Sequence, residues 1–577
     1  MTEYSGKNLK SYTADELIVL CERLREKIKS TVVKNGGHLS SNLGVIELTV
    51  ALHYVFDFPT DKLIFDVGHQ CYAHKLLSGR EDGFETLRRR GGLSGFPKRE
   101  ESAFDCYNTG HAGTSVSAAL GFAKARDIKG ENFNVIAVIG DGSFNNGLVY
   151  EAFNSLRPLN TNVLVILNDN GMSISPTVGS MHEYLEQLSQ NARHIAKVEK
   201  HSNIFERFGF SYDGVHDGND LFSMIAKLSE IKEKLKLQSV ILHVLTKKGK
   251  GYSFCEENPQ ITHGISGGEK KQAVSYSEAL GKTLVEIARN DKAIAAVTAA
   301  MTPSLGLTEF FERYPERSID VGICEEHATI LCAALAAQGL KPYYAVYSTF
   351  LQRSFDEIIL DICSQNLPVT LCIDRAGISG EDGETHQGVF DLSFLNLIPN
   401  LTVAVPKDVE EFKRMLVASA SFNAPLAIRY PKDCVRIFGG TQGGELSNWQ
   451  YISRGNCNVA VLACGERALS LAEDVNGEIT KQGLNVTIVN ARIVKPLDVE
   501  FLQGLTETVI ITLEDNQLLG GFGSCVCTHF ADNSDVRVKC FAYCDKFIPH
   551  GTAEELMKEY GLDGKKLKDY ILNNAVR

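Results

Sequence analysis

Two short polar segments, each at the end of an apolar run, carry residue types that bind a hard cation. The tripeptide GDG (140–142) ends the run NVIAVI, and NDN (168–170) ends the run NVLVIL. If these runs form neighbouring parallel strands, Asp141 and Asn170 emerge together at the carboxyl ends, where open α/β sheets bind ligands. A carboxylate and an amide oxygen suit Mg²⁺, which leaves its other positions to water and phosphates. Either segment alone is explained as a turn, but the pair, joined by one crossover, predicts a metal site.

This pair of segments resembles the thiamine-diphosphate motif, in which GDG is followed by an asparagine at a similar interval. The resemblance implies that Asp141, Asn170 and the main-chain carbonyl of Met172 hold the metal that anchors the diphosphate. Two commoner phosphate-binding motifs are set aside. The P-loop pattern GxxxxGK[ST] is absent, and the glycine-rich stretch 520–526 lacks the third glycine of a dinucleotide fingerprint.

Three histidines in the first third of the chain each follow a glycine. Imidazoles transfer protons near pH 7 and donate hydrogen bonds to a carboxylate or a developing alkoxide. One histidine in a turn is usually structural, but three with the same partner predict several imidazoles in one pocket, each beside a backbone able to bend sharply. The pairs are Gly37-His38, Gly68-His69 and Gly110-His111.

Glu325 closes the apolar run SIDVGIC and opens a predicted helix, ahead of Glu326 and His327. A carboxylate at that place also favours a helix N-terminus electrostatically, and this explanation stays open. The functional alternative uses a property of thiamine: a carboxyl group bonded to the pyrimidine nitrogen promotes the amino–imino switch that removes the thiazolium proton. The cofactor then serves as an electron sink.

Seven further polar residues fall at or just beyond predicted strand ends in the middle of the chain. Arginine forks suit a phosphate, so Arg375 and Arg429 predict a site for a phosphorylated substrate. Single surface arginines are mostly solvated, and only their clustering favours the functional interpretation. The seven residues are Tyr347, Arg353, Asp374, Arg375, Asp382, His386 and Arg429.

Most of the candidate residues named above fall at or just beyond the ends of predicted strands, so a parallel sheet is needed to bring them together. Thr13 and Glu16 form a capping-box pair before leucines at helical spacing, which predicts a first helix that ends at Gly36. Beyond it, apolar runs typical of strands buried on both faces alternate with helical stretches. Residues 145–156 are long enough for the crossover helix between the two strands that end in GDG and NDN.

Two more strand–helix series follow, separated by polar, glycine-rich stretches. Residues 247–275 and 436–450 show no sustained period and are interpreted as linkers. The sequence therefore predicts the α/β class, with three successive α/β domains and mostly parallel sheets. The predicted domains cover residues 1–265, 275–435 and 450–577.

Composition excludes several classes of protein. The chain has 577 residues, 44% hydrophobic and 23% charged, with a formal charge of −12, which argues against binding nucleic acid or an anionic membrane. No apolar run approaches the ~20 residues of a membrane span, and the N-terminus has no signal-peptide core. The 15 cysteines contain no CxxC pair and are interpreted as reduced thiols. A cytoplasmic location is predicted.

Longer segments make the chain similar to the 1-deoxy-D-xylulose-5-phosphate synthases over nearly its whole length. They are GVIELTVALHYVFDFPTDKLIFDVGHQCYAHKLLSGR, STFLQRSFDEIILDI, DRAGISGEDGETHQGVFDLSFL, RIVKPLD and FIPHGTAEEL. The resemblance implies a thiamine-diphosphate-binding, transketolase-like fold whose domains bind the diphosphate and metal, bind the pyrimidine, and form the C-terminal part. It implies thiamine diphosphate and Mg²⁺ as cofactors, and a homodimer with the cofactor between the first two domains of one chain.

The resemblance also implies an activity. Pyruvate adds to the thiazolium and loses CO₂, and the two-carbon carbanion joins glyceraldehyde 3-phosphate to give 1-deoxy-D-xylulose 5-phosphate. That product feeds isoprenoid-precursor, thiamine and pyridoxal biosynthesis. A transketolase-type transfer from a ketose phosphate, or a non-catalytic protein that binds thiamine diphosphate, remain the alternatives.

Roles carry over residue by residue under this resemblance. The implied catalytic residues are Glu325, His38, His69, His111 and His386. The implied cofactor-binding residues are His69, Gly110, His111, Gly140, Asp141, Gly142, Ser143, Asn170, Met172, Glu325, Phe350 and Arg353, of which Asp141, Asn170 and Met172 hold the metal. The implied substrate-binding residues are Tyr347, Arg375, Asp382, His386, Arg429 and His263.

Two departures from the family pattern carry expectations. The stretch between Ser180 and Phe208 is shorter than in the family, which bears on closure over the site and exclusion of water. Glu326 stands where a glutamine is common. If Glu326 lies close to Glu325, its like charge should raise the pKa of Glu325 and favour the protonated, donating form.

Overall fold

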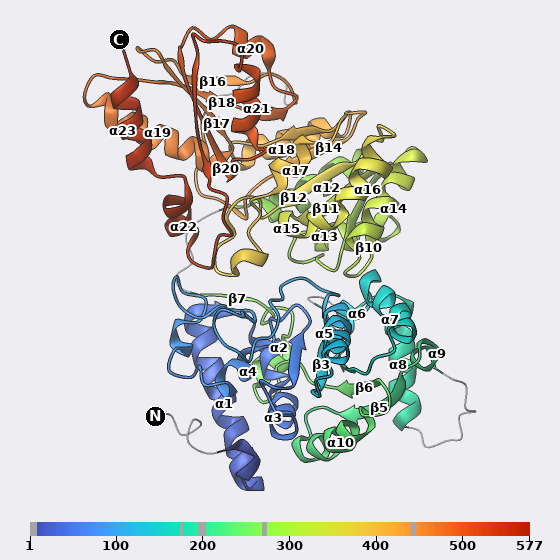
Figure 1. The fold of residues 1–577 in the computed structure, drawn as a ribbon. Coiled ribbons are helices and arrows are strands. Elements are labelled where there is room, and N and C mark those ends of the chain that lie inside the picture. The colour runs from blue at the N-terminus through green and yellow to red at the C-terminus, as the bar shows by residue number, and fades with distance from the viewer. Residues whose placement is uncertain (1–7, 174–176, 194–202, 268–273, 440–445, 577) are drawn as a thin grey trace. The chain divides into compact units, whose positions relative to one another are not determined.

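The structure is a computed structural model that describes residues 8–173, 177–193, 203–267, 274–439 and 446–576 (Figure 1). Contacts divide the chain into two units. The first contains Met1–Lys270 and Gly322–Cys324, and the second contains Lys271–Val321 and Glu325–Arg577.

A five-stranded, fully parallel sheet forms the centre of the first unit, with the strand order β2-β3-β4-β6-β5. Both apolar runs predicted as neighbouring strands lie in it, because their residues are buried on both faces, as a parallel sheet between helices requires. The strands are β2 (Lys62–Phe65), β3 (Val135–Gly140), β4 (Leu164–Asp169), β5 (Ser211–Asp217) and β6 (Val240–Leu245).

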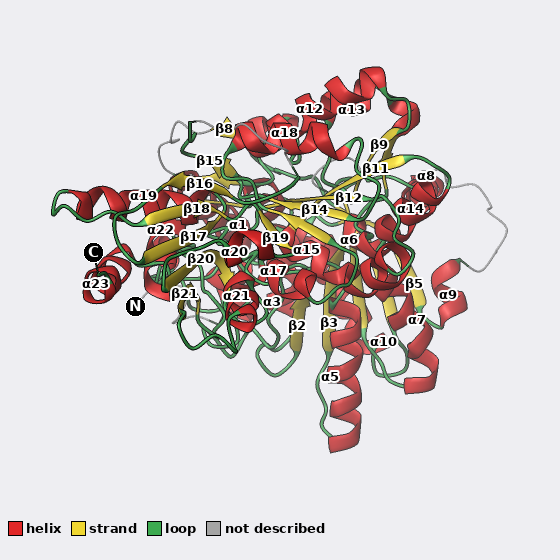
Figure 2. Ribbon diagram, turned by 90° about the horizontal axis from the view of Figure 1, so that it is seen from above, coloured by secondary structure: helices red, strands yellow, loops and turns green. Residues whose placement is uncertain are grey.

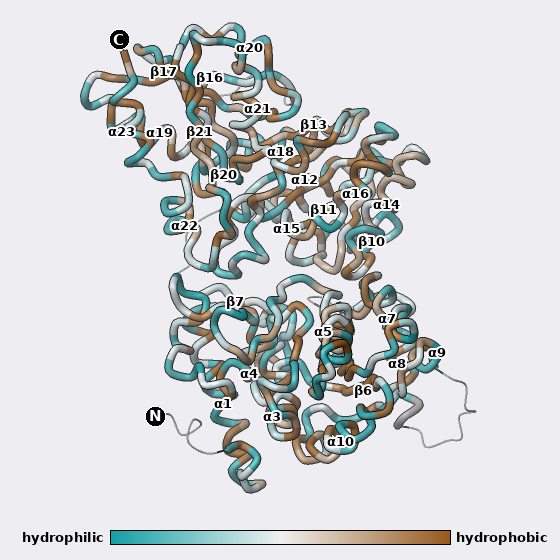
Figure 3. Tube along the Cα trace, in the orientation of Figure 1, coloured by the Kyte–Doolittle hydropathy of each residue, from teal (hydrophilic) through white to brown (hydrophobic). Residues whose placement is uncertain are grey.

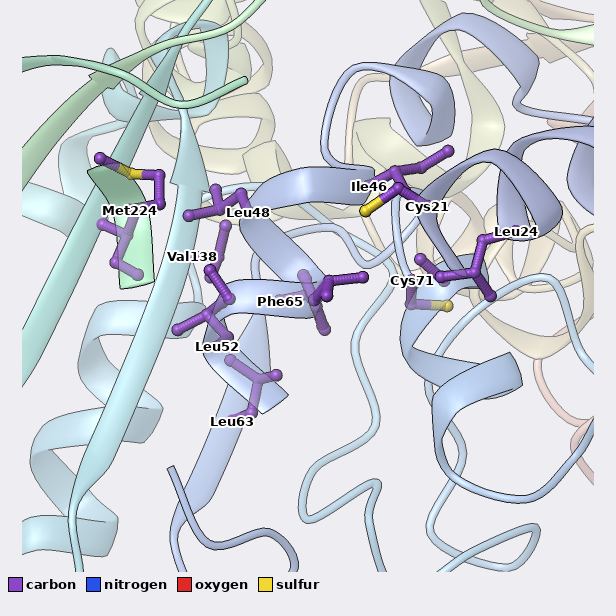
Figure 4. Close-up of a cluster of buried hydrophobic side chains, with 14 of the residues drawn as sticks. Cys21, Leu24, Ile46, Leu48, Leu52, Leu63, Phe65, Cys71, Val138 and Met224 are labelled. Carbon is purple, nitrogen blue, oxygen red and sulfur yellow. The ribbon is translucent and has the colours of Figure 1, made fainter. Parts of the chain in front are cut away.

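Helices flank this sheet and bury two separate apolar clusters against it. The capping box of Thr13 and Glu16 begins α1 as predicted, and the helix ends at Asn35. In one cluster, Leu48 and Leu52 of α3 pack with Phe65 of β2 and with α1, α4 and α10 (Figure 4). The other cluster joins α5, α7 and α9 to the sheet. The helices are α1 (Ala14–Asn35), α2 (Leu39–Leu43), α3 (Ile46–Val55), α4 (Tyr72–Leu77), α5 (Ser115–Lys129), α6 (Asp141–Phe144), α7 (Gly147–Leu159), α8 (Ser180–Arg193), α9 (Ile204–Phe208) and α10 (Leu221–Lys234).

The interpretation of residues 247–275 as a linker was wrong for its first part. This stretch contains α11 (Ser253–Glu257) and β7 (Ile265–Ser266), and β7 pairs antiparallel with β1 (Gly36–Gly37). The segment lacks a period because its order comes from contacts with residues far away in the sequence, which no local pattern reports. Residues 268–273 lie outside the described residues.

The second unit contains a seven-stranded sheet in the order β10-β9-β11-β12-β14-β13-β19, parallel except for the edge strand β19. Its strands are β9 (Ile294–Thr298), β10 (Ser318–Asp320), β11 (Lys341–Tyr347), β12 (Thr370–Asp374), β13 (Thr402–Ala404), β14 (Leu426–Arg429) and β19 (Ile493–Lys495). Its helices are α12 (Tyr276–Asn290), α13 (Thr308–Arg313), α14 (Glu325–Ala337), α15 (Ser348–Leu351), α16 (Phe355–Glu357), α17 (Asp391–Asn396) and α18 (Val409–Ser419). A two-stranded pairing of β8 (Val274–Ser275) with β15 (Asp433–Cys434) lies beside it.

A five-stranded sheet, β16-β18-β17-β20-β21, completes the second unit and is parallel except for β16. Its strands are β16 (Gln450–Ser453), β17 (Val459–Cys464), β18 (Thr487–Asn490), β20 (Val509–Gln517) and β21 (Arg537–Tyr543). Its helices are α19 (Glu466–Thr480), α20 (Val499–Gln503), α21 (Phe522–His529), α22 (Ala553–Tyr560) and α23 (Gly564–Asn574).

The two large sheets of the second unit share one hydrophobic core. Leu371 of β12, Leu462 of β17 and Ile510 of β20 belong to the same buried cluster. The third strand series also gives β19 to the edge of the seven-stranded sheet, where it pairs antiparallel with β13. The predicted boundary between residues 435 and 450 therefore stays a prediction, and residues 440–445 lie outside the described residues.

The α/β class with mostly parallel sheets is confirmed. Strands alternate with helices along the chain, as the secondary-structure colouring shows (Figure 2). Hydrophobic stretches of the chain alternate with hydrophilic ones, as expected where one face of each helix and both faces of central strands are buried (Figure 3). Over the described residues, no helix combines the length and the apolar character that a membrane crossing requires.

Candidate active site

The predicted juxtaposition of Asp141 and Asn170 is confirmed in the first unit. Gly140 of β3 pairs with Asn168 of β4, so the residues that follow the two strands emerge side by side. The backbone N–H of Asn170 donates to Asp141 Oδ1 at 3.4 Å, and Thr177 Oγ1 donates to Oδ2 at 2.6 Å. Asp141 is buried, with 1% of its surface exposed.

The electrostatics of this place favour a bound cation. Burial, and then the charge of Asp169, raise the pKa of Asp141 to about 6. Asn170 Oδ1 is buried and accepts no hydrogen bond within the described part of the chain. A hard cation would give the buried Asn170 Oδ1 a partner, and it would stabilise the ionised carboxylate of Asp141 that burial disfavours. These residues therefore fit Mg²⁺. Across the described residues, no cluster of three or more His, Cys, Asp or Glu side chains offers an alternative metal site.

Lys248 is a residue of this place that the sequence reasoning missed. It is 7% exposed, and its Nζ donates to the carbonyl of Ser173 at 2.5 Å. Burial lowers the pKa of Lys248 to about 8, while the charge of Asp141 acts in the opposite direction. The sequence feature that could have identified Lys248 is its position shortly after an apolar run, which forms β6. Because β6 is the parallel neighbour of β4, residues that follow the two strands lie on the same side of the sheet. A buried cation there suits a phosphate group.

Gly142 is the second residue of α6, directly after Asp141, and lies against Ser173. A Cβ added to Gly142 would lie 2.8 Å from Cβ of Ser173, so only glycine allows this approach. The next residue, Ser143, is hydrogen-bonded to Asp66, which is buried and whose pKa is raised by burial. Met172 lies two residues beyond Asn170, and its predicted role as a metal ligand stays a prediction.

Two of the three glycine-paired histidines, His38 and His69, form a cluster with His263 in the first unit, and the predicted place of His111 in the same pocket stays a prediction. The ring centroids of His38 and His69 are 5.2 Å apart, those of His38 and His263 are 5.4 Å apart, and those of His69 and His263 are 5.3 Å apart. Phe96 closes one side, 5.8 Å from His38. Burial, reinforced by Lys248 and the two other imidazoles, lowers the pKa of His263 well below its usual range. His263 is therefore a neutral imidazole.

Asp66, at the end of β2, positions the loop that contains His111. It accepts hydrogen bonds from the backbone N–H groups of Gly113 at 2.9 Å and Ser115 at 3.0 Å. Gly68, which directly precedes His69, has φ +89°. A Cβ added to Gly68 would lie 2.4 Å from Pro97 Cδ and 2.4 Å from Thr109 Oγ1. Gly37 and Gly68 have positive φ and so use the conformational freedom expected of these glycines, whereas Gly110 has no positive φ.

Glu325 begins α14 in the second unit and is 3% exposed. Burial raises the pKa of its carboxyl group to about 7, with a further raising contribution from Glu326 and an opposing one from Arg353. Arg353 Nε lies 3.6 Å from Glu325 Oε2 and 3.7 Å from Glu326 Oε1, so one guanidinium is shared by two carboxylates. The expected effect of Glu326 on the pKa of Glu325 is confirmed, although burial is the larger cause.

Aromatic contacts connect other predicted residues of the second unit. The rings of Tyr347 and Phe350 stack with centroids 5.6 Å apart, and Phe350 meets the ring of His386 edge-on at 5.7 Å. The guanidinium carbon of Arg375 lies 4.2 Å from the centroid of Tyr347. Asp382 acts electrostatically on Tyr347 and contributes to raising its pKa. These five residues therefore form one group.

Arg375 also lines a cavity of about 330 Å³. Its guanidinium donates to Ser277 Oγ at 2.9 Å and pairs with Asp374 at 2.8 Å. Ser304 and Lys432 line the same cavity, and so do the carboxylates of Glu278 and Glu309. The cavity offers hydroxyl and cationic groups near Arg375, but its charge is mixed.

Arg429 takes a different position from the one expected of a phosphate-binding residue. It ends β14 beside β12, yet its guanidinium is 3% exposed and pairs with Asp391 through Nε at 2.8 Å. Its Nη2 donates to the carbonyl of Asp515 at 3.0 Å. Strand pairing brings Arg429 next to the strand that precedes Arg375, but its side chain is occupied by protein groups. Its phosphate role stays a prediction.

Comparison with known proteins first defines the class. Three family models match the chain: 1-deoxy-D-xylulose-5-phosphate synthase over residues 3–202, the pyrimidine-binding domain of transketolase over 272–437, and the C-terminal domain of transketolase over 449–567. Together with the mostly parallel sheets, these matches place the protein among the transketolase-like, thiamine-diphosphate-dependent transferases. The predicted fold is confirmed.

The particular family follows from whole-chain relatives. A 1-deoxy-D-xylulose-5-phosphate synthase of Clostridium tetani is 44% identical over 609 aligned residues, covering 98% of this chain and 98% of that protein. A second, of Dictyoglomus thermophilum, is 44% identical and covers 99% of this chain and 98% of its own. A solved transketolase of Campylobacter jejuni matches with 19% identity and a TM-score of 0.44, covering 98% of this chain and 100% of its own. The chain belongs to the 1-deoxy-D-xylulose-5-phosphate synthase family, as its sequence segments predicted.

Proposed function

We propose that the protein decarboxylates pyruvate and joins the resulting two-carbon unit to glyceraldehyde 3-phosphate, giving 1-deoxy-D-xylulose 5-phosphate and CO₂. Its cofactors are thiamine diphosphate and Mg²⁺, and its product serves isoprenoid-precursor biosynthesis and, by the same resemblance, thiamine and pyridoxal biosynthesis. Membership of the synthase family over 98% of the chain supports the reaction. The observation that carries the proposal is the buried carboxyl of Glu325, whose pKa of about 7 keeps much of it protonated near neutral pH.

The first unit holds the charged end of the cofactor in this proposal. Asp141, Asn170 and the main chain at Met172 would ligate Mg²⁺, which the buried, unsatisfied Asn170 Oδ1 supports. Lys248 would neutralise a phosphate oxygen, because its buried ammonium lies at the same sheet edge. Gly140, Gly142, Ser143 and Gly110 would line the diphosphate, and the lack of a side chain at Gly142 is what allows its close approach to Ser173.

The second unit supplies the acid. When bound, thiamine diphosphate would supply a cationic thiazolium ring that serves as the electron sink for the loss of CO₂ from pyruvate. Glu325 would hold a proton on its carboxyl and donate it to the pyrimidine nitrogen, a role that its raised pKa supports. Arg353 would orient that carboxyl, and Phe350 would contact the pyrimidine ring. The imidazoles of His38, His69, His111 and His263 would hold or move protons at the reacting oxygens, as the neutral state of His263 allows.

The acceptor would bind to the group around Tyr347. Arg375 and Tyr347 would contact its phosphate, and Asp382 and His386 would bond its hydroxyl end. The contacts of Arg375 with Tyr347 and of His386 with Phe350 support a common site within this unit. Arg429 would act on the phosphate only through a rearrangement of its pair with Asp391.

Three further parts of the proposal concern the whole chain. Domains at 1–265, 275–435 and 450–577 would bind the diphosphate and metal, bind the pyrimidine, and form the C-terminal part. The protein would act in the cytoplasm, which its 15 free cysteines support. It would be a homodimer, and sedimentation at the mass of one 63.4 kDa chain would contradict that.

One assay separates this function from its alternatives. The protein is incubated with thiamine diphosphate, Mg²⁺, pyruvate and glyceraldehyde 3-phosphate, and CO₂ and sugar phosphates are measured. Stoichiometric CO₂ and a five-carbon ketose phosphate support the synthase. Turnover only with ketose phosphate donors would favour a transketolase. Cofactor binding without hydrogen–deuterium exchange at the thiazolium carbon would favour a non-catalytic protein.

A further inference from the structure

The loop between Gly377 and Gly388 contains Asp382 and His386 and is here called the acceptor loop. Its base is closed by two main-chain hydrogen bonds, from Gly377 N to Gly388 O at 2.7 Å and from Gly388 N to Gly377 O at 2.8 Å. His386 is bonded to neighbours in the loop, because its carbonyl accepts from Ser379 Oγ and its Nδ1 meets Thr385 Oγ1. The loop itself is therefore a compact unit that must be oriented from outside.

Asp515, at the carboxyl end of β20, contacts the base of this loop. Its Oδ1 accepts hydrogen bonds from Ile378 N at 3.1 Å and from the hydroxyl of Tyr543 at 2.5 Å. Its Oδ2 pairs with Arg467 Nη1 at 2.8 Å, and the same nitrogen donates to the carbonyl of Ile378 at 2.8 Å. Both polar groups of the Ile378 backbone are thus bound by side chains from the five-stranded sheet and its helix α19.

The fit at Gly377 shows how close this contact is. Gly377 has φ +78°, and a Cβ added there would lie 2.0 Å from Asp515 Oδ2. The carboxylate therefore occupies the space that any other residue would fill with its side chain. Asp515 is 6% exposed, so its charge depends on these partners rather than on water.

A second contact holds the rest of the loop. Gln387 is 2% exposed, and its Oε1 accepts from the backbone N–H groups of Ser379 and Gly380. Its Nε2 donates to Gly380 O and to Pro549 O, both at 3.1 Å. Pro549 belongs to the segment FIPHG, which has no role in the reaction proposed above. The C-terminal part of the chain therefore contacts both ends of the acceptor loop, through Asp515 and Arg467 at Ile378 and through Pro549 at Gln387.

We propose that Asp515, held by Arg467 and Tyr543, is a positioning residue of the acceptor half of the reaction. It sets the direction in which the acceptor loop presents Asp382 and His386. The inference rests on the proposed function for its kinetic consequence, but its structural consequence stands without it. Weakening the contact should let the loop move, which lowers affinity for the aldehyde acceptor and leaves the pyruvate step intact.

Tyr543→Phe tests this with the smallest change, because it removes one hydrogen bond to Asp515 and no packing volume. Tyr343→Phe is the matched control: Tyr343 is equally buried, and its hydroxyl bonds Ser419 instead, at 2.8 Å. Amide hydrogen exchange is measured by mass spectrometry on both holoenzymes. Exchange over residues 377–388 should be about three- to tenfold faster in Tyr543→Phe, and unchanged in Tyr343→Phe. Equal exchange in the two variants would overturn the proposal.

The two KM values distinguish a positioning role from a merely structural one, which would not change one constant without the other. In Tyr543→Phe and in Asp515→Asn, the KM for glyceraldehyde 3-phosphate should rise about fivefold or more, and the KM for pyruvate should stay within about twofold of wild type. Equal rises in both constants would overturn the proposal. If Asp515→Asn fails to fold, the comparison of Tyr543→Phe with Tyr343→Phe tests the proposal by itself. If the wild type makes no ketose phosphate, the proposed function fails, and the exchange experiment still decides the role of Asp515.

Discussion

Two buried carboxyl groups of the candidate site have raised pKa values for the same first cause, yet their neighbours differ. Asp141 accepts hydrogen bonds from Thr177 and from the Asn170 backbone, which favour its ionised form once a cation is present. Glu325 Oε2 accepts no hydrogen bond within the described residues and has only Arg353 at 3.6 Å. Such different surroundings support the two roles proposed for these acids, metal ligand for Asp141 and proton donor for Glu325.

The like charge beside Glu325 leads to a prediction about pH. Glu326→Gln removes a group that raises the pKa of Glu325, so that pKa should fall below about 7. The protonated form then dominates only at lower pH, and the limb of the activity profile that declines with rising pH should move to lower pH. Turnover measured from pH 5 to 9 checks this. Glu316→Gln, an exposed control with the same loss of charge, should leave the profile in place, and an upward shift in Glu326→Gln would contradict the assignment.

Removal of the acid itself should be far more damaging. Glu325→Ala should slow hydrogen–deuterium exchange at the thiazolium carbon by about 10²- to 10⁴-fold, the range of a positioned proton donor. The variant should keep its circular dichroism spectrum, because removal of a buried carboxyl with no hydrogen bond at Oε2 costs little structure. Near-normal exchange would remove Glu325 from the mechanism.

Strand ends organise the site at the next scale. In the first unit the carboxyl ends of β3, β4 and β6 place Asp141, Asn170 and Lys248 at one edge. In the second unit β11 ends at Tyr347 and β12 ends at Asp374, directly before Arg375, so both strand ends carry residues expected to bind the acceptor. Parallel pairing explains both cases, since all strands of such a sheet end on the same side.

The pair of Arg429 and Asp391 should matter for stability. Arg429→Ala leaves a fully buried carboxylate without its cation, which should cost about 3–5 kcal/mol of unfolding free energy. Arg436→Ala, which removes the pairs of a partly exposed arginine with Glu473 and Asp474, should cost only about 0–1 kcal/mol for each pair. Urea unfolding followed by fluorescence measures both. If Arg429→Ala unfolds like wild type and only the acceptor KM changes, Arg429 is a phosphate ligand rather than part of the core.

At the scale of the whole molecule, cofactor and fold should be coupled. A ligand that binds only the folded state at 100 times its Kd stabilises it by about 2.7 kcal/mol. Thiamine diphosphate with Mg²⁺ should therefore raise the Tm of the protein, and chelation of the metal should reverse the rise. Asp141→Asn should lose the increase, because the carboxylate that would ligate the metal is gone.

A control and a contradicting result complete this experiment. Glu230→Gln changes the same charge on the exposed face of α10, in the same unit, and should keep the full increase in Tm. Differential scanning fluorimetry compares the variants with and without each component. An undiminished, metal-dependent rise in Asp141→Asn would show that the ion binds elsewhere.

The sequence by itself determined the features that depend on local pattern. The Thr13 capping box predicted the start of the first helix, and uniformly apolar runs predicted buried parallel strands. The position of Asp141 beside Asn170 followed from this, because neighbouring parallel strands have their carboxyl ends on the same side of the sheet. Family-like segments predicted the chemistry of Glu325 and the histidines.

Only the tertiary structure decided which partners each charge has. It brought Lys248 and His263 from a stretch without period into the first unit, buried Arg429 against Asp391, and placed Asp515 beneath the acceptor loop. These contacts join residues far apart in the chain. Burial and charge partners, which set pKa values and loop positions, arise only when distant segments pack together, so no local pattern encodes them.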